Sequence, residues 1–158
     1  MKEQKMRNKE EDFMDCIKLD DIKLFDSLVN VKIFIKRGNG LEILIAPRNE
    51  AASKIRVIND INWFGILAGE FFEFDLDECN QKKDEKYYEL SKIIRNLINY
   101  GLEETGLVLD GKPIQYECII PVPENPISVS RTGSVLPWKK RKAKKISHKY
   151  APYQKMKK

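Results

Sequence analysis

Residues 84–99 read DEKYYELSKIIRNLIN, and the apolar side chains of this stretch recur with the period of a helix. Asp84 and Glu85 suit the positive N-terminal end of a helix, and Gly101 or Gly106 suits its termination. The sequence therefore predicts a long amphipathic helix with an apolar stripe made of Tyr87, Leu90, Ile94, Leu97 and Ile98.

The segments on either side of this helix carry the alternation of β-strands. Residues 31–45 read VKIFIKRGNGLEILI. Residues 107–122 contain an Asp-Gly pair with segments rich in apolar residues on both sides of it. Both segments indicate hairpins, because Gly, Asn and Asp tolerate the positive φ angles of tight turns. Phe72, Phe74 and Leu76 alternate with acidic residues, which predicts a further strand. The expected fold class is α+β: a mostly antiparallel sheet built from hairpins, one long amphipathic helix packed on a face, and a basic C-terminal arm.

A chain of 158 residues is long enough for one hydrophobic core, whereas each half alone would be marginal. We expect a partly helical N-terminal lead (residues 1–27), a compact α+β domain (28–124) and a basic Pro/Lys-rich arm (125–158). No apolar run reaches the roughly 18–20 residues that span a bilayer, and the N-terminus lacks the pattern of a signal peptide. The expected location is the cytoplasm, or the nucleus if the host is eukaryotic.

Charge is distributed very unevenly along the chain. Residues 125–158 contain 11 lysines and arginines and no acidic residue, which leaves 18 basic and 24 acidic residues in positions 1–124. The formal charge is therefore about +11 in the arm and −6 in the rest, although the whole chain carries only +5. Such a segment favours a polyanionic partner, because each cation placed on a phosphate releases condensed counterions.

The arm therefore predicts a non-catalytic nucleic-acid-binding protein. Its aromatic residues can stack on unpaired bases, which slightly favours RNA or single strands over duplex DNA. The predicted binding residues are the basic cluster with a preceding arginine and the aromatic residues of the arm: Arg131, Trp138, Lys139, Lys140, Arg141, Lys142, Lys144, Lys145, Tyr150 and Tyr153.

Other interpretations of the arm remain open at this point. It would also suit an acidic protein surface, which includes the acidic side chains of this chain itself at residues 73–77 and 103–104. The protein would then be an interaction module, such as an inhibitor, an immunity protein or a phage accessory protein. A solvated tail without a partner is a further interpretation. A membrane is disfavoured, because no lipidation motif or amphipathic apolar face accompanies the lysines. The sequence leaves the oligomeric state open.

Signals of catalysis are weak. No phosphate-binding loop, dinucleotide fingerprint or zinc-protease motif is present, so we expect no cofactor and assign no catalytic residue. His148 is the only histidine and lies in the basic arm, which is a poor place for a buried general base. Three widely spaced cysteines suit neither a disulfide framework nor a metal clip.

One acidic row leaves a metal-dependent nuclease as a second alternative function. Carboxylates that alternate along a strand can hold Mg²⁺ near a phosphate. However, neighbours on one face of a strand lie about 6–7 Å apart along a single line, so a solvent-facing acidic edge is the favoured interpretation. The candidate metal ligands in this row are Glu73, Asp75 and Asp77.

Overall fold

A computed structural model describes residues 29–36, 40–60, 63–76, 83–131 and 136–153 of the chain. These residues form two antiparallel sheets and two helices, so the fold class is α+β. The prediction of one sheet is wrong in number, because the chain starts a second sheet after the long helix. The lead at 1–27, the turn at 37–39 and Asp77 lie outside the described residues.

Sheet A is a five-stranded meander in which each strand pairs with the next one along the chain. Its first two strands form the hairpin predicted at residues 31–45, with Lys36 opposite Gly40. The strand predicted at residues 72–76 is present at 72–75, and the aromatic segment contributes a further strand before it, because the chain reverses at Gly69 with a φ of 57°. The strands are β1 (Val29–Lys36), β2 (Gly40–Pro47), β3 (Ile55–Asn59), β4 (Phe64–Ala68) and β5 (Phe72–Asp75).

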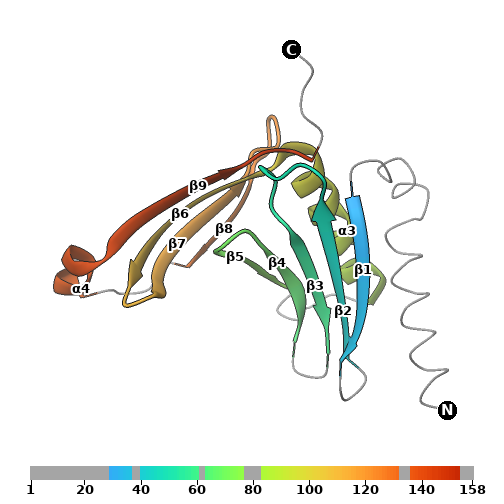
Figure 1. The fold of residues 1–158 in the computed structure, drawn as a ribbon, viewed down its shortest axis with the longest axis horizontal. Coiled ribbons are helices and arrows are strands. Elements are labelled where there is room, and N and C mark those ends of the chain that lie inside the picture. The colour runs from blue at the N-terminus through green and yellow to red at the C-terminus, as the bar shows by residue number, and fades with distance from the viewer. Residues whose placement is uncertain (1–28, 37–39, 61–62, 77–82, 132–135, 154–158) are drawn as a thin grey trace.

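The long helix predicted at residues 84–99 is α3 (Lys83–Tyr100), which lies against sheet A (Figure 1). Its buried side chains recur every three or four residues, and they join one core with the inward-facing side chains of β2–β5. The helix ends at Gly101, whose φ of 79° is a conformation that side chains rarely adopt. The buried residues of α3 are Leu90, Ile93, Ile94, Leu97 and Ile98.

Sheet B has the strand order β8-β7-β6-β9 and projects away from sheet A (Figure 1). β6 (Leu102–Leu109) and β7 (Lys112–Ile120) form the second predicted hairpin, which turns through Asp110 and Gly111. Both turn residues have positive φ angles, 52° and 76°, as the tightest hairpin turns require. β8 (Ile127–Arg131) pairs with β7, and β9 (Lys144–Tyr150) pairs with β6.

Residues 125–158 were expected to form an arm outside the compact domain, but β8 and β9, which lie in this segment, are strands of sheet B. The short helix α4 (Pro137–Lys142) lies between the two outer strands β8 and β9 in the chain. Beyond β9 the backbone of Ala151 donates to Ala51, and that of Tyr153 donates to Ile98 in α3. The segment therefore helps to hold the fold together. Among the described residues, no helix is both long and apolar enough to cross a membrane.

Candidate functional site

The basic cluster predicted from the sequence lies at the end of sheet B that is far from α3 (Figure 1). α4 places four consecutive cations there, and the first two residues of β9 add two more. All six are exposed except Lys139, which is half-buried. We call this group the cationic tip: Lys139, Lys140, Arg141, Lys142, Lys144 and Lys145.

The backbone of the cationic tip is hydrogen-bonded. The amides of Lys139 and Lys140 donate to the Leu136 carbonyl at 2.9 and 3.2 Å, and the Ala143 amide donates to Lys139 at 3.0 Å. Pro137 begins the helix, a position where its missing N–H costs no hydrogen bond. β9 then continues into the ladder with β6, in which Lys144 lies opposite Val108. The cations are therefore presented by a hydrogen-bonded helix and strand.

Two apolar side chains accompany the cations. Leu136 and Trp138 are 53% and 52% exposed, and no residue of α4 is buried. The ammonium groups of Lys139 and Lys142 lie 5.5 and 5.8 Å from the centre of the Trp138 ring, within the range of cation–π attraction. An exposed aromatic ring and positive charge thus lie together at one end of the molecule.

The charges of the cationic tip are not neutralised by ion pairs within the part of the chain that the structure describes. The contacts there include the ion pairs of Arg56 with Glu42 and of Lys149 with Glu103, and the contact of the His148 ring with Glu70; no ion pair includes a cation of the tip. Within the described residues, the cations of the tip are therefore not paired with a carboxylate.

The other predicted binding residues lie elsewhere. Arg131 is exposed at the end of β8, opposite Tyr116 of β7. Tyr153 is only 3% exposed, and its hydroxyl donates to the Ser53 carbonyl at 2.8 Å. Its predicted role in stacking on bases is therefore wrong, because the ring lies in the core. Burial raises the pKa of the Tyr153 hydroxyl above its usual value.

Tyr150 is half-buried at the junction of the two sheets, and its ring centre lies 5.8 Å from that of His148. Burial, followed by the negative charges of Glu104 and Glu70, raises the pKa of Tyr150 to about 12. Its contacts are internal ones, so it does not share the exposed surface of the cationic tip. Of the two tyrosines predicted to stack on bases, neither lies in α4 or next to it.

The predicted acidic row does not form a metal site in the described residues. Glu73 is exposed and Asp75 is half-buried on β5. No group of three or more histidine, cysteine, aspartate or glutamate side chains able to hold a metal ion occurs within the described ranges.

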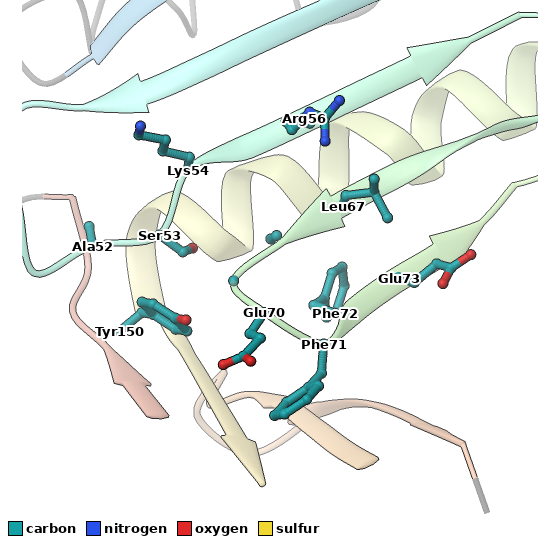
Figure 2. Close-up of a pocket in the computed structure, with 12 residues that line it drawn as sticks. Ala52, Ser53, Lys54, Arg56, Leu67, Glu70, Phe71, Phe72, Glu73 and Tyr150 are labelled. Carbon is teal, nitrogen blue, oxygen red and sulfur yellow. The ribbon is translucent and has the colours of Figure 1, made fainter. Parts of the chain in front are cut away.

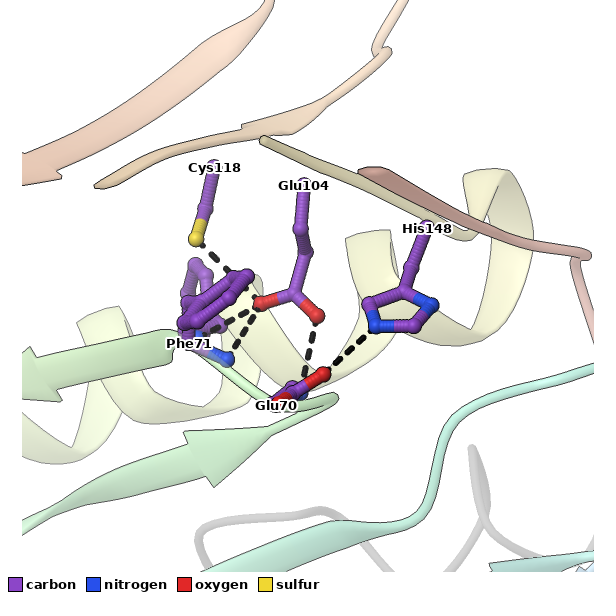
Figure 3. A network of polar contacts seen from close by, with 6 residues as sticks. Glu70, Phe71, Glu104, Cys118 and His148 are labelled. Carbon is purple, nitrogen blue, oxygen red and sulfur yellow. Dashed lines mark hydrogen bonds and ion pairs between the residues drawn. The ribbon is translucent and has the colours of Figure 1, made fainter. Parts of the chain in front are cut away.

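A buried carboxylate joins the two sheets. Glu104 of β6 is 2% exposed, and its carboxylate accepts three consecutive backbone N–H groups at the β4–β5 turn (Figure 3). The donors are Glu70 at 2.8 Å, Phe71 at 2.7 Å and Phe72 at 2.8 Å. Successive N–H groups of this kind form a concave anion site. The Glu104 carboxylate therefore occupies an anion-binding site formed by its own chain. It connects β6 of sheet B to the β4–β5 turn of sheet A.

Two neighbours complete this network. The Cys118 thiol donates to Glu104 at 3.3 Å, and the His148 ring lies 2.5 Å from the Glu70 carboxylate (Figure 3). Burial, followed by the charge of Glu104 and the hydrogen bond to it, raises the pKa of the Cys118 thiol far above its usual value. A thiol held in its protonated form is a poor nucleophile. The network consequently lies at the junction of the two sheets, with the Cys118 thiol as one of its hydrogen-bond donors.

A groove lies beside the same junction, on the outer face of sheet A (Figure 2). Its volume is about 530 Å³, and side chains of both charges line it. Arg56 already pairs with Glu42, and Glu70 with His148. The charged side chains that line the groove are Lys54, Arg56, Glu70 and Glu73.

Sequence reasoning missed the central role of Glu104. The signal was its position in β6, where Leu102, Gly106 and Val108 share its face of the strand. A carboxylate among inward-facing residues must find hydrogen-bond donors, because an unpaired buried charge is very unfavourable. The donors themselves lie 32 to 34 residues earlier in the chain.

Comparison of the chain with protein-family models, with curated proteins and with solved structures found no match.

Proposed function

We propose that the protein is a non-catalytic nucleic-acid-binding protein that holds phosphates with its cationic tip. The observation that carries the proposal is the placement of six cations, without an ion pair among the described residues, at the far end of sheet B. Each phosphate that meets a lysine or arginine releases counterions, which supplies affinity without any need for base recognition. RNA or single strands are the preferred ligands in this proposal.

The distribution of charge supports an oriented approach. Positions 1–124 carry a formal charge of about −6, while residues 125–158 carry about +11. Phosphates are repelled by the acidic body and attracted by the tip, which steers the nucleic acid to one end of the molecule. In this proposal sheet A and the amphipathic helix α3 form the scaffold, and the basic segment that this scaffold supports binds the phosphates. The protein would act in the cytoplasm, or in the nucleus of a eukaryotic host.

Matched charge variants test the proposal. Truncation before β9 is unsuitable, because it removes a strand of sheet B and the buried Tyr153. We compare Lys140→Gln/Lys144→Gln in the tip with Lys54→Gln/Lys92→Gln in the body. All four lysines are exposed, and both variants lower the net charge by the same amount.

Binding to a fluorescein-labelled 20-nucleotide single-stranded RNA is followed by anisotropy between 50 and 300 mM KCl. The slope of log affinity against log salt falls by roughly 0.7 per lost phosphate contact on a single strand. We expect the tip variant to lose affinity and up to about 1.4 of slope, while the body variant keeps both. Equal losses in the two variants would contradict a localised site.

A protein-interaction module is the second candidate, and the exposure of Leu136 and Trp138 favours it. Apolar side chains surrounded by cations would also suit an acidic protein surface with an apolar centre. Absence of RNA binding by the full chain at 50 mM KCl would turn the search toward such a partner.

A further inference from the structure

The side chains of α4 suggest which kind of nucleic acid the cationic tip takes. Trp138 is one of only two tryptophans in the chain, and at 52% exposure it does not serve the core. Its neighbour Leu136 is equally exposed. Exposing two large apolar side chains only two positions apart in the chain is unfavourable in water, so their position at the tip calls for an apolar partner.

The surroundings of the Trp138 ring match the two chemical parts of a nucleotide. The ring offers a flat apolar surface to a base, and the Lys139 and Lys142 ammonium groups lie within 6 Å of its centre. Those ammonium groups can reach the phosphates on either side of a stacked base. Stacking platforms flanked by cations are the general means of binding single strands without sequence preference.

α4 is poorly suited to a duplex. Its six residues extend about 9 Å, too short for several base contacts along a major groove. In a duplex the base faces are already stacked, so the indole has an accessible face only at ends and in unpaired regions.

We propose that Trp138 is a stacking platform for an unpaired base, and that the cationic tip therefore binds single-stranded nucleic acid. This inference rests on the proposed function, because it names the ligand of the same site. Lys139 and Lys142 position the flanking phosphates, and Leu136 is a second exposed apolar side chain at the tip. Binding is independent of sequence, since a ring face and point charges do not read base edges.

The test compares two single strands that have equal charge and differ only in their bases, and it adds a duplex, which carries about twice as many phosphates. The full chain is titrated with a thymidine 12-mer, with an abasic 12-mer of the same phosphate backbone, and with a 12-base-pair duplex, all at 50 mM KCl. We expect the thymidine strand to bind about tenfold more tightly than the abasic strand, as one stacked base predicts. Trp138→Ala should abolish this ratio, Trp138→Phe should keep part of it, and Trp63→Phe should leave it unchanged.

A second readout follows the indole directly. In the Trp63→Phe background Trp138 is the only tryptophan, so its emission should be quenched by the thymidine strand and not by the abasic strand. Equal affinity for both strands without quenching would overturn the stacking proposal and leave phosphate binding in place. Tighter binding to the duplex, compared at equal phosphate concentration, would overturn the single-strand preference. Failure of all three ligands to bind would overturn the proposed function as well.

Discussion

Replacement of Glu104 by glutamine tests whether a buried carboxylate holds the two sheets together. The substitution keeps the size of the side chain and removes its charge. One carboxylate oxygen accepts the Glu70 N–H, and the other accepts the Phe71 and Phe72 N–H groups and the Cys118 thiol. An amide has only one acceptor oxygen, so its NH₂ group must face at least one backbone N–H.

The expected loss follows from these contacts. In the better orientation the amide oxygen takes the place with three donors, and the NH₂ group faces the Glu70 N–H. One hydrogen bond to a charged group is then lost, which costs about 1.5–3 kcal/mol. The Phe71 and Phe72 N–H groups now donate to a neutral oxygen, which weakens each bond by about 1 kcal/mol. The smaller cost of burying a neutral group offsets part of this, so we expect a net loss of about 2–4 kcal/mol.

Urea denaturation, followed by far-UV circular dichroism, measures this loss. The matched control is Glu103→Gln on the same strand. Glu103 is 45% exposed, and it pairs at 3.5 Å with Lys149, which is 83% exposed. An exposed pair of this kind contributes at most about 1 kcal/mol, so the control should stay near the wild-type value. If both variants lost the same small free energy of unfolding, the Glu104 carboxylate would not stabilise the contact between the two sheets.

Three further predictions concern stability. Gly101→Ala should lower the free energy of unfolding by more than about 2 kcal/mol, because Gly101 has a φ of 79° and an added Cβ would collide with the Tyr150 carbonyl; a thermal melt within 2 °C of wild type would contradict this. Tyr153→Phe should cost about 1–2 kcal/mol through loss of the 2.8 Å bond to Ser53 and leave RNA affinity unchanged, whereas an affinity loss in the folded variant would restore a binding role for this ring. Alkaline pH should destabilise the fold, because folding raises the pKa values of three groups. The pKa of Tyr150 is raised to about 12, and those of Tyr153 and Cys118 are also raised. The unfolded chain then loses protons that the folded chain keeps, so stability is fully present below about pH 8 and falls toward pH 12. In urea titrations from pH 8 to 10.5, Cys118→Ala should delay the onset of this fall, and an identical onset would show that the Cys118 thiol does not cause it.

The parts of the fold that local sequence determines were predictable. The apolar residues of the helix at 83–100 recur with a helical period, so the helix is predictable from its own residues. The Asp110-Gly111 pair likewise predicts the turn of the second hairpin from local sequence alone. The cations of the tip were also predictable, because they are adjacent in sequence. Their place at the end of a sheet was not, since it depends on how β9 pairs.

The remaining parts depend on contacts between distant segments. In the sequence β9 resembles a basic tail, because its lysines dominate the segment. In the structure Lys145 and Lys149 face solvent, while Ile146, His148 and Tyr150 face inward. Only its pairing with β6 shows that it is a strand. Likewise, Tyr153 looked like an exposed aromatic residue near lysines, and its burial follows from hydrogen bonds to residues about 100 positions earlier. No local pattern encodes such partners.

Mapping where a bound strand touches the protein tests the central claim most directly. The full chain is bound to a single-stranded RNA that contains 4-thiouridine, irradiated, and digested with a protease that cleaves after acidic residues. Because no acidic residue follows Glu124, residues 125–158 remain one fragment. Our account predicts that the RNA adduct lies on this fragment, within Leu136–Lys145, and that Lys140→Gln/Lys144→Gln reduces its yield. Adducts found only on fragments from residues 1–124 would contradict the assignment of the cationic tip.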